Sequence, residues 1–304
     1  MDVNPPPQRL PGDRGHLARL LDAWARESEE PVTSGRLRRL VGVIAIIQSL
    51  DGLKDNKGRE RIAFKGGAAL ELRFGFRART SNDLDGAYRG DVSEAIGLID
   101  EGLKRGWSGF TGTATEGEPI MGTGLAVPPM RFRVKLLYKG KEFVTVPMEL
   151  SPVEGRSLDQ VEVLMAAVSL APVQLAEANS IPFLPIRYQV AQKIHACTED
   201  VGEERPNQRA RDLADLLLIE ELALDDDQMP DLREACVEIF KLRGKHPWPP
   251  TVTTWPGWEE IWGRLVDTES DRGARRTHHR RPRSRPQEPP PRRKWCSWNH
   301  QHHS

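Results

Sequence analysis

The stretch FKGGAALELRFGFRARTSNDLD, residues 64–85, constrains the fold of this chain more strongly than any other segment. A glycine pair, Gly66-Gly67, separates a short apolar run from a helical pattern, and Asp83 and Asp85 follow two residues apart. Side chains two residues apart on a β-strand share one face of the sheet. A strand at this position therefore predicts two carboxylates lying side by side, close to a glycine turn.

This combination predicts a site for phosphate and metal. Paired aspartates supply the oxygen ligands that a hard cation such as Mg²⁺ prefers. A glycine pair at the start of a helix leaves backbone N–H groups and the positive end of the helix dipole free to hold a triphosphate. Each feature alone is common in ordinary turns. Their joint order is far more specific, and it is the arrangement that phosphoryl-group chemistry requires.

The rest of the chain shows patterns that place this segment in an α/β (α+β) fold. Helices are expected over Arg14–Glu29, from the cap candidates Thr33 and Ser34 to about Ile47, and over Ala68–Phe74, Val92–Arg105, Ile186–Glu199, Ala210–Leu222 and Asp231–Leu242. Strands are expected over Arg61–Lys65, Asp83–Tyr88, Arg131–Tyr138 and Glu142–Leu150, and a loop over Thr111–Gly124.

These elements predict two domains. An α/β catalytic domain is expected over residues 13–155, followed by a mostly helical domain over 156–268 that completes the active site. Residues 1–12 are rich in proline and are expected to be flexible. The Arg/Pro/His-rich residues 269–304 are expected to form a disordered basic tail, because they offer little apolar surface to bury.

The chain has a net charge of zero, but the charge is unevenly distributed. Ten arginine or lysine residues and one acidic residue lie between Arg272 and Lys294, which leaves a net charge of −9 on the rest of the chain. A body with this balance is not a general nucleic-acid binder. A nucleic-acid partner must be held by a local patch or by the tail.

Cysteine spacing and hydropathy argue against several other classes of protein. Cys197, Cys236 and Cys296 show neither the spacing of a disulfide framework nor that of a zinc site. The first residues do not resemble a signal peptide. The longest apolar stretch, Val41–Leu50, is about half of the roughly 20 residues that a membrane-spanning helix needs. We expect a cytoplasmic protein with no membrane partner.

Two blocks of the sequence resemble the AbiEii/AbiGii-type nucleotidyltransferases. These are the toxin halves of bacterial toxin–antitoxin and phage-defence pairs, and they include the MenT-type toxins. The family pattern GG-x-AL followed by R-x-S/T-x-D-[IL]-D is found here as GGAAL from Gly66 and RTSNDLD from Arg79. A helical lysine followed by R-x-RD-x-x-DL is found as Lys193 and the segment Arg209–Leu216. The likeness covers roughly residues 35–225.

The resemblance implies a fold of the DNA-polymerase-β type, an NTP co-substrate and a Mg²⁺ or Mn²⁺ cofactor. It implies the following roles: Asp83 and Asp85 bind metal, Gly66, Gly67 and Ser81 face the triphosphate, and Lys193 and Asp212 complete the pocket. The lysine role agrees with its chemistry, because an ammonium group neutralises charge on phosphate oxygens in the transition state. Asp212 is expected to orient this lysine or the acceptor.

Several assignments stay open at this point. The third metal carboxylate is assigned to Glu149, with Glu142 and Glu154 as alternatives. Arg79 either clamps phosphate or offsets the repulsion between the two aspartates. Asp215 lies on the same helix face as Asp212, where pairing with Arg209 or Arg211 would make it a structural residue.

The expected reaction transfers NMP from an NTP to an acceptor and releases pyrophosphate. The resemblance makes the tRNA 3′ end the leading acceptor, in a type IV-like toxin–antitoxin or phage-defence system with a possible antitoxin partner. The alternative is a degenerate module of the same fold that binds nucleotide or a partner protein without catalysis. The presence of Asp83, Asp85, Lys193 and Asp212 together favours the enzyme.

Overall fold

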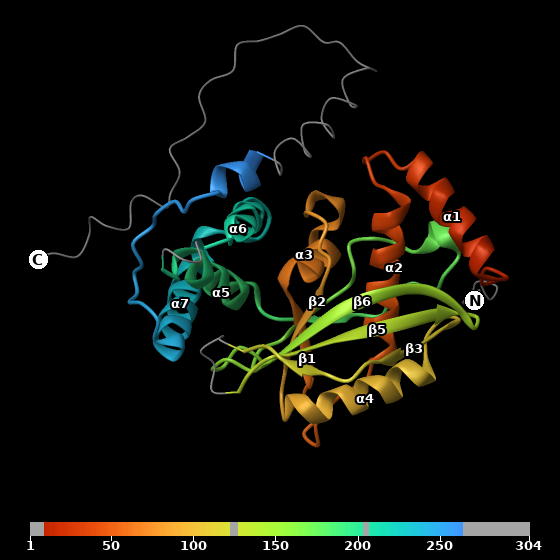
Figure 1. The fold of residues 1–304 in the computed structure, drawn as a ribbon, viewed down its shortest axis with the longest axis horizontal. Helices are drawn as coiled ribbons and strands as arrows, with labels where there is room; N and C mark the ends of the chain where they lie inside the picture. The colour runs from red at the N-terminus through yellow and green to blue at the C-terminus, as the bar shows by residue number, and fades with distance from the viewer. Residues whose placement is uncertain (1–8, 122–126, 203–206, 264–304) are drawn as a thin grey trace, which may run out of the picture.

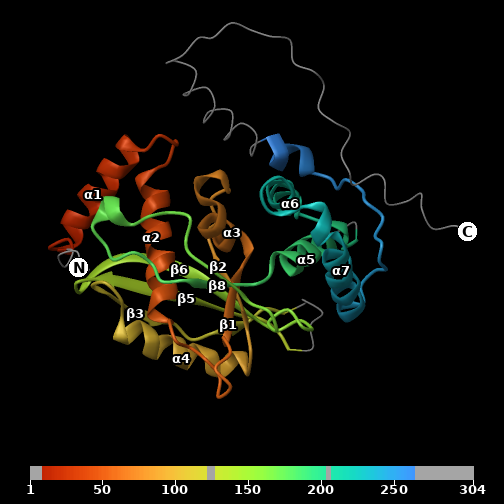
Figure 2. The ribbon, with the colours of Figure 1, turned by 180° about the vertical axis from the view of Figure 1, so that it is seen from behind.

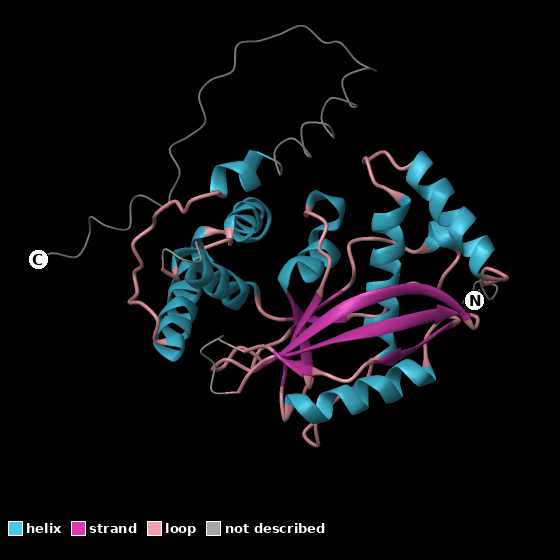
Figure 3. Ribbon diagram, in the orientation of Figure 1, coloured by secondary structure: helices cyan, strands magenta, loops and turns pink. Residues whose placement is uncertain are grey.

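One mixed sheet organises the fold (Figures 1 and 3). The computed structural model describes residues 9–121, 127–202 and 207–263. The strands follow the order β3–β5–β6–β2–β1–β8–β7, with β4 beside β5. They are β1 Ile62–Lys65, β2 Leu84–Tyr88, β3 Phe110–Ala114, β4 Glu118–Pro119, β5 Met130–Tyr138, β6 Lys141–Pro152, β7 Glu162–Leu164 and β8 Ile181–Phe183.

The helices lie on one face of this sheet and at one of its ends (Figures 1 and 2). They are α1 Arg14–Glu27, α2 Ser34–Ser49, α3 Gly66–Phe74, α4 Val92–Arg105, α5 Ile186–Thr198, α6 Ala210–Ala223 and α7 Met229–Arg243, with short 3₁₀ turns η1 Gly75–Arg77, η2 Ala171–Val173 and η3 Asp226–Gln228. Side-chain caps begin three of the longer helices, where Asp13, Thr33 and Asp91 accept bonds from backbone N–H groups.

The two faces of the sheet differ because side chains alternate along its strands. On β5, Phe132, Val134 and Leu136 are buried, whereas Arg133 and Lys135 between them are exposed. The buried side chains form one core with α1, α2 and α4. The opposite face near the ends of β1, β2 and β6 carries polar side chains instead, and it is the face on which the predicted site residues lie.

A second core joins the sheet to α5, α6 and α7. Ala63 and Ala87 of β1 and β2, together with Leu184, belong to the same buried cluster as residues of the three helices. Figure 1 shows these helices gathered at the end of the molecule opposite α1. The helices therefore form one wall beside the polar face of the sheet.

Most of the expected elements are confirmed, but four details differ. Thr111–Gly124 is not a loop throughout, because β3 and β4 pair with β5; the small Gly112 allows close approach to Leu136. The sheet also continues past residue 155 through β7 and β8, whose few residues gave little periodic signal. The third difference is in the first residues of two elements, since α3 begins at Gly66 itself and β2 begins at Leu84, one residue later than expected.

The N-terminal segment is the fourth difference. Residues 9–12 are not free, because the Tyr138 hydroxyl donates to the Pro11 carbonyl oxygen at 2.9 Å and Leu10 packs against the core. Residues 1–8 and the tail 269–304, for which disorder was expected, lie outside the described residues. No helix in the described part of the chain has the length and apolar character to cross a membrane.

A buried ion pair fixes the segment that leads into the site. Arg36 Nε on α2 donates to Glu71 Oε1 on α3 at 2.5 Å, and the same guanidinium donates to the Ala78 carbonyl oxygen at 2.5 Å. Both side chains are about 5% exposed. Because Ala78 directly precedes Arg79, this pair positions the polypeptide between α3 and β2.

We expect Glu71→Ala to lower the free energy of unfolding by about 3–5 kcal/mol, because it leaves the Arg36 charge buried and unpaired. Glu221→Ala, which removes an exposed ion pair with Arg77, serves as the control. We expect the loss of that ion pair to cost about 1 kcal/mol or less. Urea unfolding of both variants measures the difference, and equal losses would show that the buried pair does not hold α2 and α3 together.

Candidate active site

A cleft of about 660 Å³ lies between the polar face of the sheet and the helical wall. The structure brings every predicted site residue to this one cleft. Its lining includes Gly66, Gly67, Arg79, Ser81, Asp83, Asp85, Glu149, Lys193 and Asp212. Segments more than a hundred residues apart in sequence therefore meet here, whereas the individual roles of these residues remain predictions.

The register of the sheet builds a charged row across the floor of the cleft. Asp85 on β2 is directly paired with Lys65 on β1 and with Glu149 on β6. Glu149 is paired in turn with Arg131 on β5. Paired residues of adjacent strands point to the same face. Two carboxylates therefore lie between two cations, and Asp83, which directly precedes β2, adds a third carboxylate nearby.

The negative charges of Asp83, Asp85 and Glu149 repel one another, which disfavours the ionised forms of the two aspartates. Burial raises the pKa of Asp85 to about 6, and the nearby Glu149 and Asp83 carboxylates add to the rise, although Lys65 opposes it. Burial and Glu149 likewise raise the pKa of Asp83. A bound divalent cation would relieve this repulsion.

The carboxylates of Asp83 and Asp85 suit Mg²⁺, although the protein alone does not supply all of its ligands. In the described residues, no three or more His, Cys, Asp or Glu side chains are grouped closely enough to hold a metal ion. Arg131 holds Glu149 through Nε at 2.7 Å and Nη2 at 2.5 Å. Protein sites for Mg²⁺ commonly use one or two carboxylates and complete the coordination with substrate phosphates and water. Asp83 and Asp85 meet that requirement.

The glycine pair brings the start of α3 close to these acids. Gly66 has φ +72°, a left-handed conformation that favours glycine, and a Cβ atom there would clash with the Asp85 carboxylate. A Cβ atom on Gly67 would lie 2.9 Å from Ser81. No side chain caps the first turn of α3. Its N-terminal backbone N–H groups therefore lie beside Asp85 and Ser81, as a triphosphate site requires.

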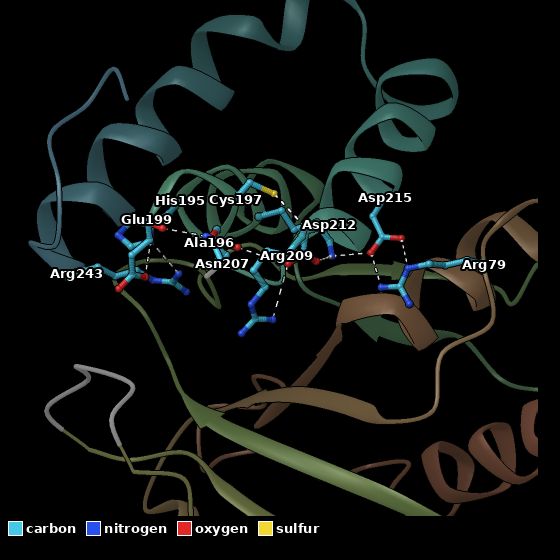
Figure 4. Close-up of polar contacts among 11 residues, drawn as sticks. Arg79, His195, Ala196, Cys197, Glu199, Asn207, Arg209, Asp212, Asp215 and Arg243 are labelled. Atoms are coloured by element: carbon cyan, nitrogen blue, oxygen red, sulfur yellow. Dashed lines mark hydrogen bonds and ion pairs between the residues drawn. The ribbon is translucent and has the colours of Figure 1, made fainter. Parts of the chain in front are cut away.

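A buried network of four charges forms the helical side of the cleft (Figure 4). The Lys193 ammonium donates to Asp212 Oδ1 at 2.7 Å and to Asp215 Oδ2 at 2.8 Å. Arg79 Nε and Nη2 each donate to Asp215 at 2.8 Å. Lys193 is 8% exposed and Asp215 is 2% exposed. A single carboxylate thus joins the loop before β2 to α5 and α6.

The pairing predicted for Asp215 needs correction. Asp215 pairs with Arg79 and Lys193, not with Arg209 or Arg211, because α6 turns this carboxylate inward. Arg79 consequently faces Asp215 (Figure 4), while its two predicted roles, clamping phosphate and offsetting the repulsion between Asp83 and Asp85, stay predictions. Arg209 approaches Asp212 only at 3.8 Å.

The network favours the charged forms of Lys193 and Asp212. Burial by itself lowers the pKa of Lys193, but the attraction of Asp212 and Asp215 outweighs it, so that this pKa lies above its ordinary value. Burial by itself raises the pKa of Asp212, and Lys193 more than offsets that effect. The cleft therefore holds an ammonium group beside the Asp212 carboxylate at neutral pH.

The structure separates the three candidates for a third metal carboxylate. Glu149 lies next to Asp85, as expected from its position on β6. Glu154 is held at both oxygens by Arg243, at 2.7 and 2.9 Å. Glu142 pairs with Lys135 near the exposed β5–β6 hairpin. Of these three, Glu149 alone lines the cleft described here.

Sequence reasoning missed several residues of the cleft. Lys65 donates to Ser151 Oγ at 2.8 Å beside Asp85, and its position directly before the glycine pair was the available signal. Gln189 and Gln192 lie within one turn of Lys193 on α5 and line the cleft with it. Arg131 could not be found, because it depends on the β5–β6 register.

Comparison with protein families identifies the family of this chain. A family model described as nucleotidyl transferase AbiEii toxin, type IV toxin–antitoxin system, matches residues 48–297. The protein is thus a nucleotidyltransferase. More specifically, the chain belongs to the AbiEii toxin family of type IV toxin–antitoxin systems. The match starts later than the sequence likeness described above and extends beyond residue 225 into the basic tail.

Solved structures show only distant likeness. MenT4, a nucleotidyltransferase toxin from Mycobacterium tuberculosis H37Rv, is 19% identical with a TM-score of 0.49, covering 77% of this chain and 75% of its own. An antigenic nucleotidyltransferase-like protein from Paracoccidioides brasiliensis is 18% identical with a TM-score of 0.40, covering 70% and 91%. ANT(2″)-Ia in complex with adenylyl-2″-tobramycin is 11% identical with a TM-score of 0.27, covering 68% and 95%. No curated protein sequence gives a match.

We expect Gly66→Ala to damage the cleft more than its backbone conformation alone predicts. Gly58 has φ +74° in open space, so Gly58→Ala is a matched control that should cost about 1–2 kcal/mol of stability. Gly66→Ala adds a clash with Asp85 and should abolish nucleotide binding as well. Denaturant unfolding and calorimetric titration with an NTP measure the two effects. Retained nucleotide binding in Gly66→Ala would show that the glycine is needed only for the turn.

Proposed function

We propose that this toxin-family enzyme transfers NMP from an NTP to an acceptor hydroxyl and releases pyrophosphate in a metal-dependent reaction. The observation that carries the proposal is the pairing of Asp85 with Glu149 next to the N-terminus of α3, in the same cleft as Lys193. Acids for a cation, free N–H groups for phosphate and a fixed ammonium group together suit phosphoryl transfer.

Each part of the cleft has a proposed role. Mg²⁺ or Mn²⁺ would be held by Asp83 and Asp85, with Glu149 as the third acid, and would supply positive charge for the phosphate oxygens. The N–H groups at Gly66 and Gly67 and the Ser81 hydroxyl bind the triphosphate. The Lys193 ammonium neutralises charge that develops as pyrophosphate leaves, and Asp212 holds this ammonium in place.

Asp215 acts as a positioning residue in this proposal. Its two oxygens bind Arg79 and Lys193 at the same time, so both cations are fixed before a nucleotide arrives. A preorganised cation does not have to reorder during the reaction, which is the main source of electrostatic stabilisation in such sites. The same bonds keep α6 beside the loop that contains Ser81.

The proposed acceptor is the tRNA 3′ end. The support is the family to which the chain belongs, together with the exposed Arg209 and Arg211 at the rim of the cleft. Because the body of the chain is acidic, a nucleic acid would have to be held by such a local patch. A cognate antitoxin, a role in phage defence and a cytoplasmic location complete the proposal.

We also propose a division into a catalytic and a helical domain, with the boundary moved from residue 155 to about residue 185. Strands β7 and β8 belong to the sheet, and α5 begins at Ile186. The helical part contributes Lys193 and Asp212 and thereby completes the cleft.

Labelling tests the reaction directly. The purified protein is incubated with each α-³²P-labelled NTP, total RNA and Mg²⁺, and the products are separated on a gel. We expect label in a tRNA-sized band, loss of labelling with EDTA, and recovery with Mg²⁺ or Mn²⁺. Nucleotide binding without any transfer to RNA, protein or small molecules would favour the non-catalytic module.

We expect Asp83→Ala and Asp85→Ala to abolish transfer without unfolding the protein, because removing one of several close like charges seldom destabilises. Glu149→Gln should also impair transfer. Glu142→Gln, a matched change at the hairpin acid bound to Lys135, should leave transfer intact. Single-turnover labelling and circular dichroism provide the two readouts. Full activity in both aspartate variants would eliminate the proposed metal site.

Two substitutions of Lys193 separate its catalytic role from its structural role. Lys193→Ala leaves Asp212 and Asp215 short of positive charge, so we expect a loss of about 3–5 kcal/mol in stability as well as activity. Lys193→Arg keeps the charge but replaces the compact ammonium group. It should retain most of the stability, while kcat falls roughly 10²- to 10³-fold. Near-normal kcat in Lys193→Arg would make the lysine a structural residue.

A further inference from the structure

An unsatisfied acceptor lies in the wall of the cleft. Gln189 on α5 lines the cleft and is 2% exposed, and its Nε2 donates to the Leu184 carbonyl oxygen at 2.9 Å. Its Oε1 atom is buried and has no hydrogen-bond partner in the described part of the chain. Turning the amide would place oxygen against the Leu184 carbonyl oxygen, so the orientation is set by this bond. A buried carbonyl oxygen without a donor is costly.

The neighbouring Gln192 carries a second side-chain amide, whose oxygen can also accept a hydrogen bond. Its Nε2 donates to Glu154 Oε1 at 3.1 Å, and Glu154 is held at both oxygens by Arg243. The bonds from Arg243 outweigh the effect of burial and lower the pKa of Glu154, so this carboxylate accepts and does not donate. The amide nitrogen of Gln192 must therefore face Glu154. Gln192 is half-buried, and its Oε1 is not enclosed in the way that the Oε1 of Gln189 is.

Both glutamines lie where a bound nucleotide would pass. They precede Lys193 on α5 by four residues and by one residue, and all three side chains line the cleft. Residues three and four apart on a helix are neighbours on its surface. The lining contains no aromatic side chain among the described residues. Stacking on an aromatic ring is thus not available there, and polar groups have to distinguish one nucleotide from another.

We propose that Gln189 and Gln192 determine nucleotide specificity by accepting hydrogen bonds from N–H or O–H groups of the NTP. The proposal rests on the proposed nucleotidyltransferase function and adds the substrate feature that the cleft reads. Two acceptors favour a base with an exocyclic amino group, such as cytosine or adenine, over a base with a carbonyl oxygen at that position. Ribose hydroxyl groups are the second possible source of the same donor chemistry.

The experiment compares nucleotides that differ in one donor. Equilibrium affinities of the full-length protein for non-hydrolysable α,β-imido analogues of CTP and UTP are measured with Mg²⁺ by calorimetry. The 2′-deoxy and 3′-deoxy forms of the preferred analogue test the ribose. The variants are Gln189→Met and Gln192→Met. Gln208→Met makes the same change at an exposed glutamine of the cleft rim and serves as the control.

We expect the wild-type protein to bind a nucleotide with the donor roughly 5- to 100-fold more tightly than one without it. The ligand without the donor leaves a buried acceptor unpaired. Gln189→Met and Gln192→Met should reduce that ratio to about twofold or less, and Gln208→Met should leave it unchanged. If the glutamine variants change only the ratio of the affinities for the CTP and UTP analogues, the donor belongs to the base. If they change only the ratio of the affinities for the ribo and deoxy analogues, the donor belongs to the sugar.

Two results would overturn the inference. The first is an unchanged ratio in folded Gln189→Met and Gln192→Met, and the second is an equal loss in Gln208→Met. Circular dichroism melting checks the fold. Gln192 is only partly buried, so its variant provides the test if Gln189→Met is unstable. Failure of the wild-type protein to bind any nucleotide would instead remove the proposed function, and this inference with it.

Discussion

The carboxylate of Asp215 joins the two halves of the cleft. Arg79 reaches it from the loop before β2, and Lys193 reaches it from α5, while Asp215 itself lies on α6. All three bonds are 2.8 Å long, and the carboxylate is almost fully buried. A buried charge that loses its partners is strongly destabilising, so the closed arrangement of these elements is maintained before any ligand binds. The charged row on the sheet and the ammonium group on α5 consequently face each other at a fixed separation.

Electrostatic balance explains why so many ionised groups share one site. On the sheet, Lys65 and Arg131 flank Asp85 and Glu149, and on the helical side of the cleft Arg79 and Lys193 are matched by Asp212 and Asp215. The helical set is balanced within the protein. The sheet set is not, because Asp83 adds a further negative charge and the pKa values of both aspartates are raised. The excess negative charge is therefore concentrated on the side of the cleft that is proposed to bind the cation.

Local patterns were sufficient to predict much of the fold and the membership of the site. The glycine pair, the spacing of Asp83 and Asp85 and the helical face of Lys193 are short-range features, and each of these residues lines the cleft. The features that the sequence did not predict depend on contacts between distant segments or on very short strands. The partner of Asp215 is Arg79, 136 residues away, and no helical spacing rule can select it over the nearby Arg211. Arg131 enters through strand register, and β7 and β8 are too short to show a period.

The anchoring of Pro11 by Tyr138 has a practical consequence for handling the protein. Tyr138 ends β5 at the end of the sheet near α1, whereas α5, α6 and α7 lie at the opposite end (Figure 1). Helix 258–263 lies beside the cleft wall, because Trp258 Nε1 donates to the Asn207 carbonyl oxygen at 2.6 Å, next to Gln208 and Arg209. An affinity handle or fluorophore attached ahead of residue 9 is thereby tethered away from the substrate entrance. One attached directly after residue 263 would start close to it and compete for the same space.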